Sequence, residues 1–326
     1  MADTMRAWRV TAYGEPAEVM SLDEVPVPEP GPGEVLIRNR AVAVNFPDVL
    51  LARGTYQERP PLPFTPGIEL CGEVVALGAG VDRIPLGRRV VATAIGVMAE
   101  YAAVPAASVH DAPDALDDAA ASAFLIAYQT AWFGLHQRAA LQDGETLLVH
   151  AAAGGVGTAA CQLGAAAGAT VVGVVGSEAK VPVAEAAGAA RVLLRGDEWI
   201  GAVKAAGGAD VVFDPVGGDA FEGAAKVINF EGRIIVVGFA SGEIQRVRAD
   251  LALVKNYSVL GLHWALYQRK RPDLVAEAHA ALTRLADAGA VRPVVAETVP
   301  FADASQAVQR LAGGGTVGRL VVAVGE

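Results

Sequence analysis

The chain has 326 residues, of which 53% are hydrophobic and 19% are charged, and its formal net charge is −10. This length favours two domains with substantial buried cores. The acidic balance disfavours binding along a nucleic-acid backbone, and no apolar run is long enough to cross a bilayer without a charge, Gly or Pro.

The amino-terminal stretch MADTMRAWRV lacks the basic and then apolar order of a secretory signal. The two cysteines, Cys71 and Cys161, stand far apart. That usage is typical of a reduced cytosolic protein and not of a disulfide-stabilised one. We therefore expect a cytoplasmic protein with no membrane and no nucleic-acid partner.

The first part of the chain, up to about Phe124, is rich in turns and short β-like runs. The segments 34–44 and 72–81 carry β-branched residues that Gly and Pro interrupt, and the Pro-rich stretches between such runs are expected to be loops. From about 119 to 140, Ala, Leu and aromatic residues recur at helical spacing.

From Glu145 onward, short apolar runs alternate with Ala-rich helical stretches. Strands that are apolar throughout are buried on both faces, so this pattern predicts a parallel sheet covered by helices. The expected strands cover 146–151, 170–176, 191–195, 210–218, 232–240 and 257–264, and the expected helices cover 156–168, 178–188, 200–206 and 220–230.

The end of the chain has a long helical segment at 273–288 and two β-like runs whose texture matches the amino-terminal region. The chain is therefore expected to leave a β-rich domain, form a doubly wound α/β domain and return. The predicted boundaries are 1–124 with 265–326 for the β-rich domain and 125–264 for the α/β domain.

The segment AAAGGVG (151–157) lies directly between an expected strand and an expected helix. As Ala152-x-Gly154-x-x-Gly157, it matches the dinucleotide fingerprint with Ala in the first position. Gly154 removes a β-carbon where a pyrophosphate approaches, and Gly157 lets the helix lie close to its strand. We predict that the dinucleotide phosphates bind at Gly154, Gly155, Val156 and Gly157, the alternative being a plain turn in a chain with 37 glycines.

The end of the second expected strand indicates which dinucleotide binds. NAD sites usually have Asp or Glu there, whereas this strand ends in Gly176-Ser177, with Lys180 one helical turn later. A hydroxyl and an ammonium suit a 2′-phosphate, and Arg195 after the third strand adds a cation. We predict NADPH, with NADH left possible, because Glu178 counts against a phosphate and Ser177 is also a plausible helix cap.

Metal ligands are scarce in this sequence. Hydride-transfer enzymes often use zinc held by Cys and His, but the chain has two Cys and five His, with no CxxC and no HExxH. We predict no metal. GxSxG and the phosphate loop ending in GK[ST] are also absent. Without a Lewis acid the hydride acceptor must itself be electrophilic, such as a quinone, an enone or an enoyl thioester.

Several sequence blocks, in the same order, resemble the zinc-independent quinone oxidoreductases, the ζ-crystallin-like branch of the medium-chain dehydrogenases/reductases. The resemblance implies a GroES-like β-rich catalytic domain, a Rossmann cofactor domain, a cleft between them and a homodimer contact at the edge strand. The blocks are NFPDVLLARGTY (45–56), LPFTPGIELCGEVVALGAGV (62–81), AYQTAWFGL (127–135), HAAAGGVG (150–157), DVVFDPVGGDAF (210–221), GRIIVVGFASG (232–242) and KNYSVLGLHW (255–264).

The resemblance also implies roles for single residues. Asn45 and Thr130 should lie near the nicotinamide and its ribose, and Arg319 looks like a cation that approaches the phosphates. Asn45 replaces a zinc-ligating Cys of the zinc members, and Gly67-Ile68-Glu69 replaces their Gly-His-Glu. The residues expected to flank the nicotinamide carboxamide are Gly238, Phe239 and Ala240.

The resemblance places Ser177 and Lys180 at the positions that bind the 2′-phosphate, and Arg195 where Tyr is often found. Tyr56 matches a proton-donating Tyr of related enoyl-thioester reductases and a pocket residue of quinone reductases. Asn45 has a structural alternative, in which its side chain satisfies loop backbone groups.

The predicted function is an NADPH-dependent quinone oxidoreductase that transfers hydride to a quinone or similar electrophile without metal. Asn45 and Tyr56 are the candidate catalytic residues. One alternative is an NADPH-dependent reductase of enoyl-thioester or alkenal double bonds. Another is a non-catalytic NADPH-binding protein.

Overall fold

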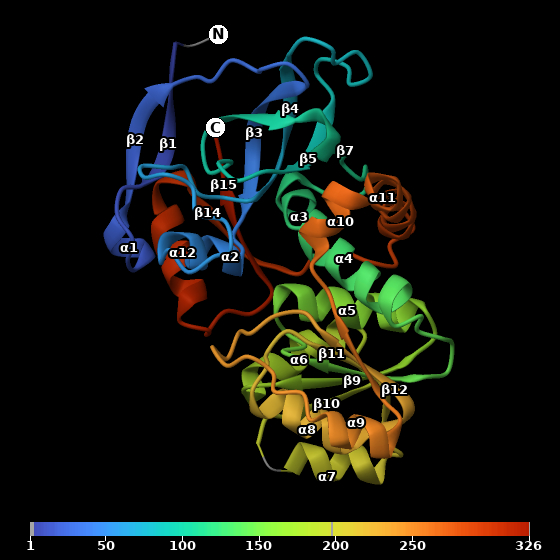
Figure 1. The fold of residues 1–326 in the computed structure, drawn as a ribbon. Helices are drawn as coiled ribbons and strands as arrows, with labels where there is room; N and C mark the ends of the chain where they lie inside the picture. Colours follow the sequence, from blue (N-terminus) through green and yellow to red (C-terminus); the bar gives the residue numbers. More distant parts are fainter. Residues whose placement is uncertain (1–2, 197, 326) are drawn as a thin grey trace. The chain divides into compact units, whose positions relative to one another are not determined.

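The computed structural model describes residues 3–196 and 198–325, which form two compact units (Figure 1). Unit 1 contains the chain up to Ile126 and again from Val295, and unit 2 spans Ala127–Val294. The second boundary differs from the predicted one, because residues 265–294 belong to unit 2. In that unit the indole Nε1 of Trp264 donates to Gln129 Oε1 at 2.8 Å, which ties the segment to the start of the unit.

Unit 1 is built on one seven-stranded sheet, and a separate hairpin of β1 and β2 accompanies it. The strand order is β14-β15-β3-β4-β5-β7, with β6 also paired to β3. β15 runs antiparallel to β3, so the chain end returns to the first sheet as predicted. The strands are β1 (Thr4–Val10), β2 (Met20–Pro26), β3 (Glu34–Ala43), β4 (Glu69–Leu77), β5 (Arg89–Thr93), β6 (Tyr101–Pro105), β7 (Val109–Asp111), β14 (Val295–Pro300) and β15 (Arg319–Ala323).

Short helices cover this sheet. α12, which the sequence analysis did not predict, buries Ala304, Ala307 and Val308 at the i, i+3, i+4 spacing of a helix that packs one face. These side chains join one core cluster with strand residues such as Val42 and Leu70. The helices are α1 (Pro16–Val19), α2 (Phe46–Ala52), α3 (Asp118–Ser122) and α12 (Ala304–Ala312), and α4 (Leu125–Trp132) follows α3 in the chain.

Unit 2 is a doubly wound sheet of six parallel strands in the order β10-β9-β8-β11-β12-β13. In sequence terms the order is 3-2-1-4-5-6, which places the switch in connection direction between β8 and β11. Ligands bind such sheets outside the carboxyl ends of the strands at this point. The strands are β8 (Thr146–His150), β9 (Thr170–Val175), β10 (Arg191–Leu194), β11 (Ala209–Asp214), β12 (Ile228–Val236) and β13 (Ser258–Gly261).

Several elements of unit 2 end earlier than predicted. β11 ends at Asp214 and not at 218, because Pro215 follows it and Gly217 and Gly218 have positive φ of 79° and 52°. α8 ends at Val227, where β12 begins directly. The helices are α5 (Gly155–Ala166), α6 (Val181–Ala186), α7 (Glu198–Ala205), α8 (Asp219–Val227), α9 (Ala249–Lys255), α10 (Trp264–Lys270) and α11 (Pro272–Asp287), and a π-helix covers Phe133–Arg138.

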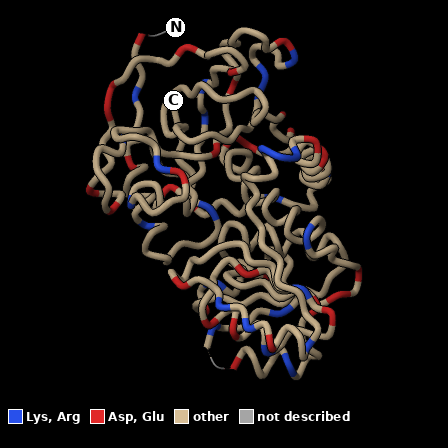
Figure 2. The backbone as a smooth tube through the Cα atoms, viewed as in Figure 1, with Lys and Arg blue, Asp and Glu red and all other residues tan. Residues whose placement is uncertain are grey.

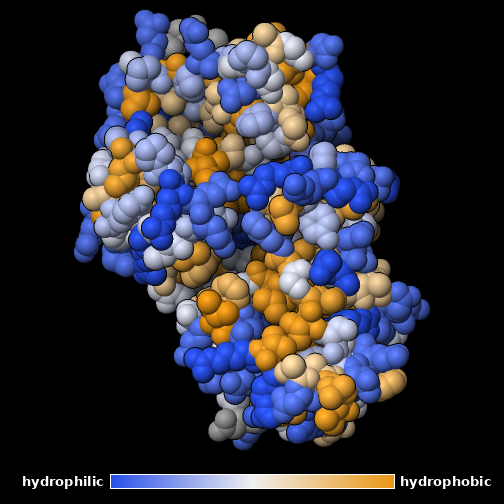
Figure 3. Space-filling view, viewed as in Figure 1, coloured by the Kyte–Doolittle hydropathy of each residue, from blue (hydrophilic) through white to orange (hydrophobic). Residues whose placement is uncertain are grey.

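The surface is mixed in charge and locally apolar. Figure 2 shows acidic and basic residues interspersed along the backbone of both units. Figure 3 shows apolar side chains gathered on one face of unit 2, over the segment that joins β13 to α10, and Leu266 in α10 is 43% exposed. None of the helices in the described residues combines the length and the hydropathy that a membrane span requires.

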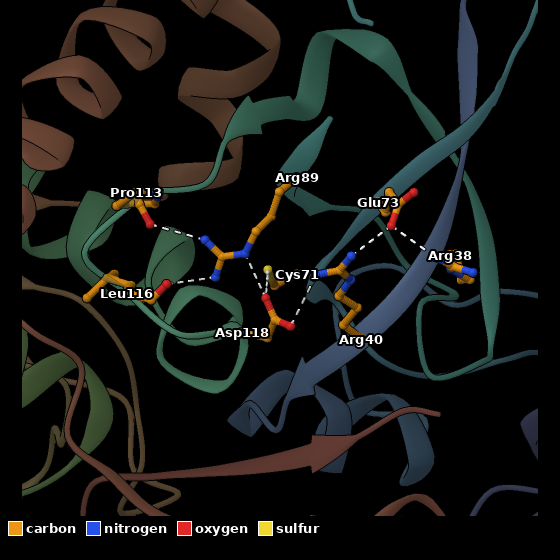
Figure 4. Close-up of polar contacts among 8 residues, drawn as sticks. All are labelled: Arg38, Arg40, Cys71, Glu73, Arg89, Pro113, Leu116 and Asp118. Carbon is orange, nitrogen blue, oxygen red and sulfur yellow. Dashed lines mark hydrogen bonds and ion pairs between the residues drawn. The ribbon is translucent and has the colours of Figure 1, made fainter. Parts of the chain in front are cut away.

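A polar network ties α3 to the sheet of unit 1 (Figure 4). Arg89 Nε donates to Asp118 Oδ1 at 2.7 Å, and its other nitrogens donate to two carbonyls of the preceding loop. Arg40 bridges Asp118, at 3.6 Å, and Glu73, at 2.7 Å. Cys71 lies beneath this network, and burial raises the pKa of its thiol to about 12. Cys71 is therefore a protonated core residue and not a nucleophile.

Candidate functional site

Unit 1 contains a buried cluster of polar side chains where β3 ends and β4 begins. Asn45 follows β3, caps α2 and is 4% exposed. Its Nδ2 donates to Glu69 Oε1 at 2.9 Å and to the Ala43 carbonyl at 3.1 Å. The amide thus donates to one carboxylate and one backbone carbonyl. The contact with Ala43 supports the structural alternative, in which the Asn45 side chain satisfies loop backbone groups.

Glu69 is the centre of this cluster. It is fully buried, its Oε2 accepts from the Ile126 backbone N–H at 2.9 Å, and its Oε1 also pairs with Arg319. Burial raises the pKa of Glu69, and the Arg319 guanidinium opposes that rise. The sequence predicted Arg319 for the cofactor phosphates, whereas in the structure it is 6% exposed and its charge is matched by Glu69.

Asp48 completes the cluster from the first turn of α2. Its Oδ2 accepts from the Asn45 backbone N–H at 2.8 Å, and its Oδ1 accepts from the Gly67 N–H at 3.1 Å. The carboxyl therefore joins the loop after β3 to the loop before β4. Full burial raises the pKa of Asp48 to about 7, with the nearby Glu69 adding to the rise.

These residues do not fit a zinc ion. Asn45 offers an amide, Ile68 is apolar, and both oxygens of Glu69 already accept hydrogen bonds. The Arg319 guanidinium supplies the positive charge beside Glu69. In the part of the chain that the structure describes, no three His, Cys, Asp or Glu side chains are grouped as metal ligands would be.

Tyr56 lies just after α2, in a turn whose backbone N–H donates to the Leu50 carbonyl at 3.2 Å. The side chain is half-buried and packs against the core of unit 1. Burial raises the pKa of the Tyr56 phenol, and Glu58 and Asp48 add to the rise. The phenol thus remains protonated at neutral pH, as a proton donor must be.

In unit 2 the glycine loop lies between β8 and α5, as predicted. Gly154 is the N-cap of α5, and among the described residues no side chain caps it. A β-carbon on Gly157 would lie 2.1 Å from the Ala151 carbonyl oxygen, so only glycine lets the helix approach the loop this closely. Ala151 has a φ of 50°, which lies in the left-handed region. It directly precedes Ala152, the first position of the dinucleotide fingerprint.

The loop and helix fit a dinucleotide. Gly155, Val156 and Gly157 form the first turn of α5, whose backbone N–H groups lack intrahelical acceptors. This turn follows β8, the strand at the switch point of the sheet. Uncapped N–H groups and the positive end of the helix dipole suit a pyrophosphate.

The ends of β9 and β10 hold the residues expected near the ribose. The Arg195 backbone N–H donates to the Val175 carbonyl at 2.7 Å. The Arg195 guanidinium lies over Gly176, 3.7 Å from where a β-carbon of Gly176 would stand. Ser177 is exposed and starts the short helical turn that contains Lys180. The structure therefore brings Arg195 beside the end of β9, as a 2′-phosphate site requires.

The remaining predicted residues of unit 2 lie on α4 and after β12. Thr130 is on α4 and 8% exposed. Gly238 lies two residues after the end of β12, Phe239 is 43% exposed, and the Ala240 N–H donates to the Pro215 carbonyl at 3.0 Å. The loops after β8, β9, β10 and β12 share the carboxyl edge of the parallel sheet, so these predicted residues of unit 2, apart from Thr130, share one edge.

Sequence reasoning missed the importance of Glu69. It treated the residue only as part of a replaced motif, although a carboxylate inside the apolar run Ile68–Cys71 is itself a signal of a buried, paired acid. Its partner Arg319 is 250 residues away, so no local pattern connects the two.

Comparison with known proteins agrees with both units. An alcohol dehydrogenase GroES-like domain model matches residues 31–114, and a zinc-binding dehydrogenase model matches residues 155–280. The quinone oxidoreductase of Sus scrofa is 34% identical over 310 residues, 93% of this chain and 92% of that protein.

Two solved structures share the whole fold. A probable oxidoreductase from Mycobacterium abscessus is 36% identical with a TM-score of 0.90, covering 98% of this chain and 99% of that one. The quinone oxidoreductase of Thermus thermophilus, which was also solved in complex with NADPH, is 33% identical with a TM-score of 0.85, covering 98% and 100%. The chain therefore belongs to the quinone oxidoreductase family of the medium-chain dehydrogenases/reductases and is an oxidoreductase.

Proposed function

We propose that this protein is an NADPH-dependent quinone oxidoreductase that reduces a quinone or a similar electrophile without a metal ion. The observation that carries the proposal is the uncapped glycine turn after β8, combined with the cation over Gly176 in the same unit. The Thermus thermophilus relative solved with NADPH supports the same cofactor. Bound NADPH supplies the hydride, and the protein supplies binding, orientation and exclusion of water.

The preference for NADPH over NADH is assigned to the end of β9. Arg195 offers a planar, permanently charged donor set at Gly176, and Ser177 and Lys180 follow Gly176 in the chain. We expect Arg195→Ala to raise the Kd for NADPH about tenfold, the loss expected for one charge-assisted contact, and to leave the Kd for NADH unchanged.

Arg191→Ala is the matched control, because Arg191 is exposed at the opposite, amino end of β10. The Kd values are measured by fluorescence titration of NADPH and NADH. Equal weakening of both cofactors by Arg195→Ala would contradict the assignment.

The acceptor is proposed to be reactive without a Lewis acid. By resemblance, Asn45 and Ile68 stand at positions where the zinc members of the superfamily have Cys and His, so a carbonyl would have no metal to polarise it. Quinones accept hydride readily, and their protons can come from water. Asn45 belongs to the buried cluster of unit 1 and is proposed to orient bound molecules through its amide.

A reductase of enoyl-thioester double bonds is the second candidate. It is favoured by the half-buried Tyr56 after α2, at the position where the resemblance places a proton-donating Tyr. The test follows loss of NADPH absorbance with a naphthoquinone or with a short enoyl thioester. Tyr56→Phe should abolish enoyl reduction and spare quinone reduction, and Tyr101→Phe in β6 is the control. Equal loss on both substrates would refute a proton-donor role.

A non-catalytic NADPH-binding protein, the remaining alternative from the sequence, is disfavoured because the chain belongs to a family of oxidoreductases. The interspersed charges in Figure 2 and the net charge of −10 argue against a nucleic-acid partner. Two free, buried cysteines fit a reducing compartment, and we propose the cytoplasm without a membrane partner.

We further propose a homodimer formed through β13. Among the described strands, β13 pairs with β12 alone, so it is an edge of the sheet, and apolar side chains gather over the segment that joins it to α10 (Figure 3). Exposed apolar edge strands need cover. Light scattering should give twice the mass of one chain, and Leu260→Lys in β13 should shift the mass to that of one chain. A wild-type protein with the mass of one chain would overturn this proposal.

A further inference from the structure

One side chain, Gln245, fastens two loops at the carboxyl edge of the parallel sheet. Its Nε2 donates to Asp214 Oδ2 at 3.2 Å and to the Gly238 carbonyl at 3.0 Å. Asp214 is the last residue of β11, and Gly238 follows β12. Gln245 therefore connects the ends of two neighbouring strands from a loop that is otherwise largely exposed.

The contacts of Gln245 fix the direction of its amide. Asp214 is fully buried, and its Oδ1 accepts from the backbone N–H groups of Val216, at 2.9 Å, and Gly217, at 3.0 Å. Its Oδ2 is thus the oxygen left for Gln245. A reversed amide would place Oε1 against a carboxylate oxygen and a carbonyl oxygen, neither of which can donate a hydrogen bond.

The other end of the amide has no partner. Gln245 Oε1 is shielded from solvent, and no donor in the described part of the chain forms a hydrogen bond with it. A shielded acceptor without a donor costs free energy, and such exceptions in a folded protein call for an explanation. The protein therefore orients the amide through Nε2, whereas Oε1 has no hydrogen-bond donor among the described groups.

The position of Gln245 indicates which ligand group could satisfy it. A dinucleotide lies across the carboxyl edge of a doubly wound sheet, with its pyrophosphate at the first strand, β8. Arg195 and Ser177 place the adenosine half on the side of β9 and β10. The nicotinamide half then lies on the side of β11 and β12, and its carboxamide carries the N–H donors of that half.

We propose that Gln245 is a specificity-determining residue for the nicotinamide half of the cofactor. Nε2 holds the loops of Asp214 and Gly238 together, and Oε1 accepts a hydrogen bond from the carboxamide N–H group. The inference rests on the proposed NADPH function and adds to it the group that recognises the carboxamide.

Calorimetry with three ligands tests this. NADP⁺ carries the carboxamide, 3-acetylpyridine adenine dinucleotide phosphate has a methyl group in place of its NH₂, and 2′,5′-ADP lacks the nicotinamide half. Gln245→Lys keeps a donor for Asp214 and Gly238 but has no acceptor, and Gln245→Met has neither. Gln142→Met is the control, because Gln142 Nε2 also donates to a backbone carbonyl but lies before β8, at the amino end of that strand.

The wild type and Gln142→Met should bind NADP⁺ about five to ten times more tightly than the acetylpyridine analogue, the preference expected for one hydrogen bond. In Gln245→Lys this preference should fall to about one, with the Kd for 2′,5′-ADP unchanged. Gln245→Met should lose the preference and also weaken both dinucleotides. Circular dichroism and thermal melting establish that each variant is folded.

An unchanged preference in Gln245→Lys would overturn the inference while leaving the proposed function intact. Equal weakening of 2′,5′-ADP would overturn it as well, because the defect would then extend to the adenosine half. A wild type that bound neither NADP⁺ nor NADPH would instead refute the proposed function, and this inference with it.

Discussion

Replacing Gly157 by Ala tests the glycine turn most directly. A β-carbon at this position would lie 2.1 Å from the Ala151 carbonyl oxygen, 2.8 Å from its carbon and 2.9 Å from Ala152 Cα. All three atoms are backbone, so no side chain can rotate away. Relief requires α5 to move by about 1 Å from the loop, because ordinary contacts begin above 3 Å.

The size of the effect follows from that displacement. Overpacking of this kind costs about 1–3 kcal/mol of stability, and in a unit of this size each kcal/mol lowers Tm by about 2–4 °C. The N–H groups of the first turn move with the helix, and misplacement by about 1 Å can cost up to 100-fold in a positioned interaction. We expect the Kd for NADPH to rise more than tenfold.

Fluorescence titration with NADPH and thermal melting measure the two effects together. Gly201→Ala in α7 is the matched control, because, among the described residues beyond its chain neighbours and its own helix backbone, no atom lies within 4 Å of the added carbon. It should leave NADPH binding unchanged and add up to about 1 kcal/mol of stability. If Gly157→Ala retained the wild-type Kd and Tm, the close approach of α5 to the loop would be refuted.

Three further predictions concern the buried cluster of unit 1. Glu69→Gln leaves the Arg319 guanidinium buried without its carboxylate, so urea unfolding should show a loss of about 3–5 kcal/mol; a loss below about 1 kcal/mol would contradict the pairing. Burial raises the pKa of Asp48 from 3.8 to about 7, so the folded protein keeps a proton that the unfolded chain has lost over that range. Stability from this group should therefore fall as pH rises towards 7, by at most about 1.4 kcal/mol per pH unit, and urea unfolding of Asp48→Asn should show a flatter pH profile. Finally, 1,10-phenanthroline should leave NADPH oxidation unchanged, because Arg319 supplies the positive charge beside Glu69; inhibition that added zinc reverses would contradict this.

Much of unit 2 could be predicted from the sequence, because buried parallel strands are apolar throughout and alternate with helices. The boundary at 264 was placed too early, because the strand series ends there in sequence while Trp264 packs back onto Gln129. α9 was missed because its apolar residues Leu253 and Val254 are exposed and form no inward-facing stripe. In both segments the structure is determined by tertiary contacts, which the periodicity of the sequence does not reveal.

The candidate site also has a part that could be predicted from the sequence and a part that could not. The turn around Gly154 was predictable because its spacing and its strand–helix context are local. The pairing of Glu69 with Arg319 was not, since the two residues meet only when β15 joins the sheet. Gln245 was missed because its role depends on two strand ends that the sequence does not bring together.

The return of β15 to β3 also has a consequence for synthesis on the ribosome. Unit 2 is continuous in sequence, so it can collapse as soon as residue 294 has left the exit tunnel. Unit 1 must wait, because β6 pairs only with the first half of β3, and residues 41–43 of that strand have β15 as a partner only after residues 319–323 emerge. The nascent chain therefore carries an incomplete sheet through most of translation, and this is the period when chaperone protection of β3 matters most.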